Sequence, residues 1–231
     1  MPKLTVVIPT LDEERTIGSC LEAVGESSGL EIVVSDGGSR DATCEIAARA
    51  GATVVRGTQG RGPQLNRGAA AGSAPRLLFV HADCRLPAGW RAALDRALDD
   101  PSTALACFRL HTVPAGPGGS SSRVARLWLR ALDLRSMLPL LPYGDQGFGV
   151  RREIFDAVGG FPPIPLMEDL SFARSCRRHG RTRRLPLAMR TTARRFERAP
   201  LRARLMTLSF PTLFRLGVPP QRLARWYGKA R

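Results

Sequence analysis

Three features are scarce in this sequence of 231 residues: lysine, paired cysteines and long apolar runs. Only Lys3 and Lys229 are lysines, so 33 of the 35 basic residues are arginines, whose planar guanidinium groups suit bidentate contact with phosphates or carboxylates. The cysteines are odd in number and widely separated, and they include no Cys-x-x-Cys pair: Cys20, Cys44, Cys84, Cys107 and Cys176. This pattern argues against a disulfide framework and against a zinc cluster, and it favours a reducing cytoplasm.

The apolar runs are too short or too interrupted for a secretion signal or a membrane span. The run at 4–8 is shorter than the apolar region of a signal peptide. The stretch 124–142 is broken by Arg126, Arg130, Asp133 and Arg135, and each of these charges is costly at the centre of a bilayer. We therefore expect no secretion signal, no membrane-spanning segment and a cytoplasmic location.

Acidic residues are almost absent from the C-terminal segment. Residues 170–231 contain 16 arginines and one lysine against a single acid, Glu197, whereas the first 169 residues have a net charge of −1. Arginine-rich codon usage explains the low lysine content but not this segregation, because it acts on the whole gene. The segment therefore predicts an anionic partner: nucleotide phosphates, nucleic acid or an anionic membrane surface.

Two of these partners can be weighed from the sequence. Nucleic-acid-binding modules pair basic residues with exposed aromatic side chains, and most of the few aromatic residues here are expected in the core, so we expect no nucleic-acid partner. The stretches 205–216 and 223–227 interleave apolar residues with arginine and could lie on anionic lipid. Peripheral contact with the inner face of the membrane therefore stays open.

The first half of the chain alternates strand and helix patterns. Short apolar runs at 4–8, 32–34, 53–55 and 77–80 predict strands, and the β-branched run at 4–8 predicts a buried parallel one. Helical spacing or composition follows each of the first three, with acids at 12–14 in the expected first helical turn, a helix over 41–50 and another around 65–71. This alternation predicts an α/β fold: a Rossmann-like, mostly parallel sheet with helices on both faces.

The second half is less regular. We expect helices at 90–98, 124–138, 152–158 and from 167 to about 179, a strand at 104–110, and a mobile loop at 114–122 that is rich in Pro, Gly and Ser. Short strands and two arginine-rich helices are expected in 181–231. Length and composition favour one domain over 1–231.

Acids follow three of the predicted strands. Asp12 and Glu13, Asp36, and Asp83 come after the first, second and fourth strands, and ligands of such sheets bind at the carboxyl ends of the strands. Acids that converge there imply a divalent cation or a ribose and base ligand. Helix capping is the alternative, and we prefer it for Asp12 and Asp41.

These motifs together resemble the family 2 glycosyltransferases of the GT-A fold. The resemblance rests on Val7–Glu14, on Val34–Thr43, on Asn66 and Asp83, and in the second half on Gly159-Gly160-Phe161, 167–171 and 177–180. It covers nearly the whole chain. More narrowly, 60–68, 81–83 and 143–147 resemble the radical-SAM/selenodomain-associated, arsenosugar-type subgroup.

The resemblance implies a donor site. Pro9, Leu11 and Glu13 would line the nucleoside pocket, Asp36 would accept a hydrogen bond from the base, and Arg61 would approach the base or the diphosphate. Asp83 matches the last acid of the family's Asp-x-Asp motif, which holds Mn²⁺ or Mg²⁺. His81 replaces the first acid, which puts the identity of the metal and the dependence on it in doubt; we expect His81 to pack nearby more readily than to be a ligand.

The resemblance also implies an acceptor site. Asp169 would be the general base, with Glu168 raising its pKa or orienting the acceptor; the alternative is that both acids favour a helix N-terminus. Asp145 and Gln146 are candidates for acceptor recognition, although 143–147 could be only a tight turn. Arg194 and Arg195 could close over the diphosphate, and surface charge is nearly as good an explanation.

We therefore expect an inverting glycosyltransferase that uses a nucleotide-diphosphate sugar, with UDP implied by the resemblance, and a small-molecule or lipid acceptor. Residues 1–111 would bind the donor, and 112–231, with the basic C-terminal helices, would bind the acceptor. Two alternatives are a nucleotidyltransferase acting on sugar phosphates and a membrane- or anion-binding protein with a degenerate GT-A fold. Acids at 12–14 would repel a triphosphate, which weighs against the first.

Overall fold

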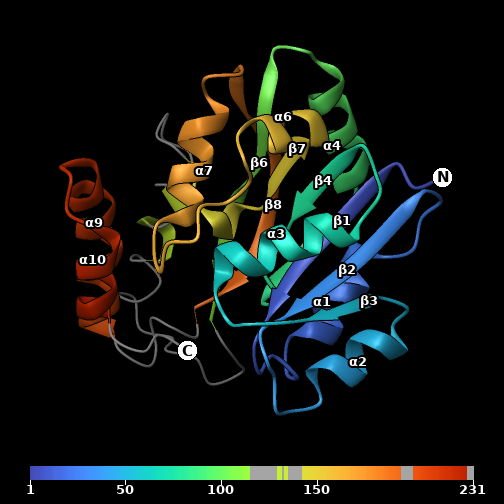
Figure 1. The fold of residues 1–231 in the computed structure, drawn as a ribbon, viewed down its shortest axis with the longest axis horizontal. Helices are drawn as coiled ribbons and strands as arrows, with labels where there is room; N and C mark the ends of the chain where they lie inside the picture. Colours follow the sequence, from blue (N-terminus) through green and yellow to red (C-terminus); the bar gives the residue numbers. More distant parts are fainter. Residues whose placement is uncertain (115–128, 132, 135–141, 194–199, 228–231) are drawn as a thin grey trace.

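The computed structural model describes residues 1–114, 129–131, 133–134, 142–193 and 200–227. Eight strands in this part of the chain form one sheet in the order β3-β2-β1-β4-β7-β6-β8-β5 (Figure 1). Their bounds are β1 Leu4–Thr10, β2 Leu30–Asp36, β3 Thr53–Arg56, β4 Arg76–Phe79, β5 Cys84–Arg85, β6 Thr103–Val113, β7 Phe148–Arg151 and β8 Arg181–Thr192.

The first four strands are parallel. β1 pairs with β2 from Leu4↔Leu30 to Thr10↔Asp36, and with β4 on its other side. Successive side chains of β1 pack into two different hydrophobic clusters, because alternate residues of a strand face opposite sides of the sheet. Val6 and Ile8 belong to one hydrophobic cluster, whereas Val7 belongs to the other. The predicted sheet with helices on both faces is confirmed in this half.

The second half extends the same sheet with mixed pairing. β7 lies between β4 and β6 and is antiparallel to both, while β6 and β8 are parallel. A cluster of aromatic rings packs one face here, and Phe161 and Phe172 stack at 4.1 Å between ring centroids. Strands from both halves of the chain therefore share one continuous sheet.

The helices of the described residues cover both faces of this sheet. Their bounds are α1 Ile17–Val24, α2 Thr43–Arg49, α3 Arg61–Ala71, α4 Trp90–Asp99, α6 Arg152–Ala157, α7 Glu168–Cys176, α9 Pro200–Arg215 and α10 Pro220–Tyr227, with a 3₁₀ turn η1 at Gly144–Gln146. None of the helices in these ranges is long and apolar enough to cross a membrane.

Several boundaries differ from expectation. α1 begins at Ile17, so the acids at 12–14 lie in the loop before the helix and not in its first turn. α3 begins at Arg61 and contains Gly62 and Pro63 in its first turn, where the missing N–H of proline is tolerated. The helix therefore begins before its predicted start at about residue 65.

Three strands were not anticipated as such, among them the two-residue β5. β7 is a four-residue strand, and the 181–192 stretch forms one long strand instead of short ones. In β8, Leu185 and Met189 point inward while most of the intervening residues are exposed or half-buried. Most of the predicted loop at 114–122 and helix at 124–138 lies outside the described residues.

Candidate functional site

The loops that follow β1 and β2 are tied together by reciprocal hydrogen bonds. The N–H of Asp12 donates to Ser39 Oγ at 2.9 Å, and the N–H of Arg40 donates back to Asp12 Oδ1 at 2.9 Å. The N–H of Glu13 donates to Thr43 Oγ1 at 2.8 Å. Asp12 adopts a left-handed φ of 53°. We expected Asp12 to cap α1, and this expectation is wrong, because the N-cap position belongs to Thr16. The carboxylate of Asp12 instead joins the two loops.

Asp41 contributes to the same junction. Its Oδ1 accepts the N–H of Thr43 at 3.0 Å, immediately before α2, and its Oδ2 accepts the N–H of Glu14 at 3.1 Å. The first contact is close to the expected capping role, although Ala42 occupies the N-cap position itself.

Asp36 lies at the carboxyl end of β2 and is 1% exposed. Its Oδ2 accepts the N–H groups of Gly38 and Ser39 at 2.9 and 3.0 Å, and its Oδ1 accepts the hydroxyls of Thr10 and Ser39. Burial raises the pKa of Asp36, but these hydrogen bonds outweigh it and hold the pKa below the ordinary value. The carboxylate is thus ionised and shapes the 37–39 loop; contact with a base stays a prediction, and it would have to displace or share one of these bonds.

Gln64 links this loop to α3 and was given no role from the sequence. Its Nε2 donates to the carbonyls of Thr10 and Ser35 at 2.8 and 3.0 Å, and its Oε1 accepts the N–H of Gly60 at 3.1 Å. Gln64 is 5% exposed. It fixes the start of α3, and therefore Arg61, against the ends of β1 and β2. Its place in the 60–68 motif was the available signal.

Arg61 meets the acceptor-side motif directly. Its Nη1 lies 3.2 Å from Glu168 Oε1, and the side chains are 47% and 2% exposed respectively. Burial raises the pKa of Glu168, Arg61 lowers it, and the charge of Asp169 raises it again. The predicted donor-side arginine and the predicted acceptor-side acid therefore form one ion pair, and Glu168 positions Arg61.

Asp169 is held by two backbone N–H groups at the start of α7. Its Oδ2 accepts from Gly144 at 2.8 Å and its Oδ1 accepts from Leu170 at 2.7 Å. A Cβ added at Gly144 would lie 3.1 Å from His81 Nε2 and 3.4 Å from Asp169 Oδ2. The loop after β4, the turn η1 and the start of α7 thus meet around Gly144. The strand-end site is the name used below for His81, Gly144 and Asp169 together with Arg61, Asp83 and Glu168.

Met167 immediately precedes this pair of acids in a left-handed conformation, with φ 67° and ψ 20°. A long side chain rarely adopts this region, and a residue held there costs about 1–3 kcal/mol. Such strain occurs where the surrounding contacts fix the backbone. Here it sets the direction of the first turn of α7, which carries Glu168 and Asp169.

His81 packs inside the strand-end site. Burial lowers its pKa to about 3, and the nearby charge of Arg61 lowers it further. The imidazole is therefore neutral at pH 7, so one of its nitrogens donates a hydrogen bond and the other accepts one. This environment agrees with the expected packing near the site; whether His81 contacts a metal stays untested.

Asp83 and Asp145 both contact a buried cysteine. Cys84 Sγ is 3.6 Å from Asp83 Oδ1 and 3.8 Å from the carbonyl of Asp145. Burial raises the pKa of the Cys84 thiol well above its ordinary value, and the charges of Asp83 and Asp145 contribute. The two predicted acids, one for the metal and one for the acceptor, are therefore neighbours.

Among the residues that the structure describes, no three His, Cys, Asp or Glu side chains group to hold a metal ion. A metal bound by Asp83 would need most of its ligands from a substrate diphosphate and water. This donor set fits Mg²⁺, which keeps several waters and binds through one or two carboxylates plus phosphates.

Gln146 supports the η1 turn from within. It is 1% exposed; its Oε1 accepts the N–H of Tyr143 at 3.0 Å and its Nε2 donates to the carbonyl of Phe108 at 2.9 Å. The structure gives Gln146 a positioning role, and direct contact with an acceptor stays a prediction. Pro9 and Leu11 are half-buried at the end of β1 and just beyond it. Arg194 and Arg195 lie outside the described residues.

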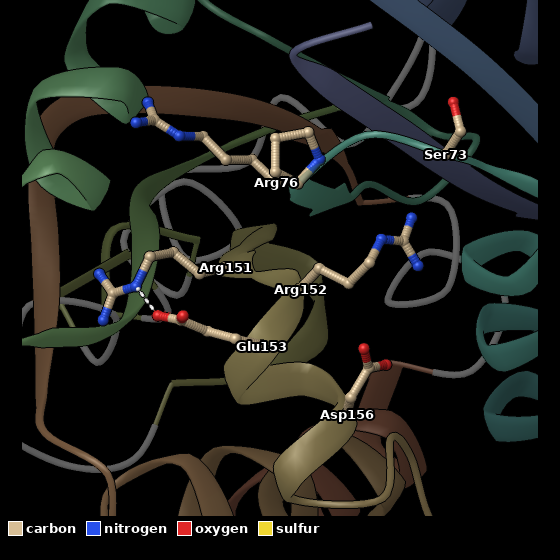
Figure 2. Close-up of a pocket in the computed structure, with 7 residues that line it drawn as sticks. Ser73, Arg76, Arg151, Arg152, Glu153 and Asp156 are labelled. Carbon is tan, nitrogen blue, oxygen red and sulfur yellow. Dashed lines mark hydrogen bonds and ion pairs between the residues drawn. The ribbon is translucent and has the colours of Figure 1, made fainter.

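A separate cavity of about 640 Å³ lies at the opposite end of the sheet, where β4 begins and β7 ends. Figure 2 shows its lining side chains, among them the ion pair of Arg151 and Glu153. Arg152 donates to the carbonyls of Ala69, Gly72 and Ala74. These contacts satisfy carbonyls at and just after the C-terminal end of α3, so Arg152 has a structural role here. We call this cavity the back cavity.

Comparison with known proteins places the chain in a family. The sequence profile described as glycosyl transferase family 2 matches residues 5–159. An uncharacterized glycosyltransferase of Mycobacterium tuberculosis is 35% identical over 97 residues, which are 42% of this chain and 44% of that protein. Glucosyl-3-phosphoglycerate synthase of Mycolicibacterium paratuberculosis is 39% identical over 92 residues, 35% of this chain and 28% of that protein. The matches thus span less than half the length of these relatives.

Solved structures share the fold. A mannosyltransferase of Pyrobaculum calidifontis, in complex with GDP-Man and Mn²⁺, superposes with a TM-score of 0.69 at 22% identity and covers 95% of this chain and 66% of that one. Glucosyl-3-phosphoglycerate synthase of Mycobacterium tuberculosis, in complex with Mn²⁺, UDP and phosphoglyceric acid, gives 0.55 at 25% identity over 81% and 69% of the two chains. The predicted GT-A fold is confirmed.

Proposed function

Because the chain belongs to glycosyl transferase family 2, we propose that it transfers a sugar, with inversion, from a nucleotide-diphosphate donor to a small-molecule or lipid acceptor. The observation that carries this proposal is the geometry around Gly144, where Asp169, His81 and the loop bearing Asp83 converge at the carboxyl ends of the parallel strands. The narrower arsenosugar-type assignment remains a prediction, since the profile match is to the family as a whole.

On the donor side, Pro9, Leu11, Glu13, Asp36 and Arg61 bind the nucleotide in this proposal. Two features support it: the loops after β1 and β2 are locked together by Asp12 and Ser39, and Gln64 fixes α3 against both strand ends. A rigid backbone at this position lowers the entropic cost of holding a base. A UDP donor is the first choice because a relative at 25% identity is described with UDP and Mn²⁺.

Asp83 is the residue that would hold Mn²⁺ or Mg²⁺ in this site, beside the diphosphate. When bound, such an ion neutralises the charge that develops on the leaving diphosphate. Arg61 lies on the same side, and its guanidinium, positioned by Glu168, suits a phosphate oxygen. The arginine side chain is 47% exposed, so it is accessible to a ligand while one nitrogen stays on Glu168.

Asp169 is the general base of the proposed reaction. Inversion requires a group that removes the acceptor proton as the acceptor attacks the anomeric carbon from the side opposite the diphosphate. A carboxylate held by two N–H groups is fixed in position for this role. Asp145, in the middle of the η1 turn, is proposed to contact the acceptor, with Gln146 supporting the backbone that presents it.

The C-terminal half, 112–231, is proposed to bind the acceptor, and 1–111 the donor. Within the described part, α9 and α10 carry five arginines and no acid, and Leu205, Leu216 and Trp226 are exposed. These features support peripheral contact with an anionic membrane. The family match favours glycosyl transfer over nucleotidyl transfer or a degenerate binding protein.

Two variants separate the proposed roles. Asp83→Ala should abolish donor binding, whereas Asp169→Asn should leave donor binding intact and reduce transfer by about 10²–10⁴-fold, the typical contribution of a general base. Asp156→Asn, an exposed acid beside the back cavity, is the matched control. Equal loss of binding and transfer in both site variants would contradict the assignment.

A further inference from the structure

A cavity of about 500 Å³ between α7 and α9 is lined by four arginines: Arg174, Arg177, Arg178 and Arg215. We call it the arginine pocket. Three of the residues come from α7 and the positions just after it, and Arg215 is the last residue of α9. Figure 1 shows α9 on the outer side of α7. All four side chains are exposed, so the pocket is open to solvent.

The spacing along α7 explains why three of these charges share a face. Residues three and four apart on a helix are neighbours on its surface, which brings Arg174 beside Arg177 and Arg178. Each of these pairs repels, since like charges at this spacing destabilise a helix. The fourth guanidinium approaches from a helix more than thirty positions later in the sequence, which increases the repulsion. A partner anion would remove this cost.

The back cavity provides a contrast. Two arginines of the back cavity have carboxylate partners: Arg76 pairs with Asp95 at 2.9 Å and with Asp99 at 2.6 Å, and Arg151 pairs with Glu153 at 2.8 Å. No carboxylate of the described residues pairs with any of the four arginines of the arginine pocket, and its lining contains no other residue type.

Compensation of the helix dipoles explains part of this arginine cluster. Cations near the C-terminal ends of helices are favourable, and both α7 and α9 end here. One cation at each helix end is enough for this favourable interaction. It does not account for three guanidinium groups at the end of one helix that face a fourth across a cavity.

We propose that the arginine pocket binds the phosphate group of a ligand at a site separate from the strand-end site. Guanidinium groups bind phosphate through paired N–H donors, and the volume lies in the range of small-molecule sites. Arg177 follows Asp169 by eight positions, which is about 12 Å along the helix axis. A phosphate here is therefore not the leaving diphosphate, and the inference does not depend on the proposed transferase reaction. The phosphate is either that of a soluble phosphorylated molecule or that of an anionic lipid headgroup.

The test is calorimetric titration of the full chain with inorganic pyrophosphate in the presence of a chelator. The double variant Arg174→Gln/Arg178→Gln and the independent variant Arg215→Gln should each weaken a saturable affinity, by about tenfold or more for the double variant, because two charge-assisted contacts are removed. The control Arg222→Gln/Arg225→Gln removes the same charge from α10, outside the pocket, and should retain the affinity. Unchanged melting temperatures without pyrophosphate would show that the variants fold.

Sedimentation with phosphatidylcholine vesicles, with or without phosphatidic acid, distinguishes the two sources. Loss of vesicle binding in the Arg174/Arg178 variant but not in the Arg222/Arg225 control identifies a lipid phosphate. Pocket-dependent pyrophosphate binding with equal vesicle binding by all variants identifies a soluble ligand. Absence of saturable pyrophosphate binding, or equal weakening by the pocket and control variants, would overturn the proposal.

Discussion

The backbone N–H of Gly144 donates to Asp169 Oδ2 at 2.8 Å, and a Cβ added at Gly144 would lie 3.1 Å from His81 Nε2 and 3.3 Å from Asp169 Cβ. The absence of a side chain at position 144 is therefore what lets the imidazole and the carboxylate approach the same turn. This relationship joins three segments that are distant in sequence, and it leads to the first prediction.

Gly144→Ala should lower the rate of transfer by about tenfold to a hundredfold, because a displacement of the base by a fraction of an ångström is costly in a preorganised site. The rate of nucleoside-diphosphate release from the donor is the measurement. Gly18→Ala is the control, since its added Cβ would meet only Ile46 Cγ2, at an ordinary 3.7 Å. A Gly144→Ala enzyme as fast as the wild type would show that the position of Asp169 does not limit the reaction.

Arg61→Gln should destabilise the protein more at high pH than at low pH. Burial already raises the pKa of Glu168 and Arg61 opposes this, so removing Arg61 raises the pKa further. A carboxyl whose pKa is raised in the folded state loses folding stability as pH increases from its unfolded pKa through its folded pKa. We expect a loss of about 1–2 kcal/mol at pH 8, below the full effect of breaking a buried pair because Arg61 is half-exposed.

Urea unfolding at pH 4 and pH 8 checks this expectation. Arg49→Gln removes an arginine from an exposed pair in which the side chains are 68% and 69% exposed, so it should change stability little at either pH. A loss in Arg61→Gln that is the same at both pH values would contradict the role assigned to the buried Glu168 carboxylate.

His81 should make folding stability increase with pH between about pH 3 and pH 6.5. Its folded pKa is lowered to about 3 by burial and by Arg61, whereas the unfolded imidazole titrates near 6.5. Only the unfolded state binds the proton between these values, so the contribution reaches a slope of about 1.4 kcal/mol per pH unit. His81→Gln should flatten the pH dependence of the unfolding free energy, whereas the exposed His179→Gln should not. An equal slope in wild type and His81→Gln would show that the imidazole is protonated in the folded protein.

Asn66→Ala should lower stability by about 1–3 kcal/mol, because two hydrogen bonds are lost from a partly buried position. Asn66 Nδ2 donates to the carbonyl of Phe161 and its Oδ1 accepts the N–H of the same residue, both at 2.8 Å. This pair ties α3 to the Gly-Gly-Phe segment. Denaturant unfolding measures the change. Asn66→Asp keeps the acceptor alone and should be intermediate; stability equal to the wild type in both variants would exclude the link.

The parallel half of the fold was predictable because its signals are local. The apolar runs of β1, β2 and β4 are continuous in sequence, as is typical of strands that are covered on both faces of a sheet. β7 was missed because its four residues lie between a turn motif and a helix, and only pairing with β4 and β6 makes them a strand. The length of β8 was obscured by the arginines among its residues, and its pairing with β6 over 103–113 supplies the missing information.

The site was predictable in its residue types but not in its connections. Asp83, Glu168 and Asp169 were named from their motifs, yet a motif does not say that Glu168 pairs with Arg61 or that Gly144 meets both His81 and Asp169. The roles of Asp36 and Gln146 depend on burial, which a single sequence does not reveal for polar residues. Gln64 was overlooked because its three hydrogen-bond partners lie in three separate segments.

The most direct test of the proposed function is the thermal stability of the wild type and of Asp83→Ala with UDP, GDP and their sugar derivatives, in Mn²⁺, Mg²⁺ or chelator. Ligand binding to the folded state adds about 2.7 kcal/mol to the free energy of unfolding at a hundredfold excess of ligand over Kd. This increase raises the melting temperature measurably. We predict a metal-dependent increase with UDP or a UDP-sugar that Asp83→Ala removes. No increase with any nucleotide, or an increase that Asp83→Ala retains in full, would contradict a donor site at the ends of these strands.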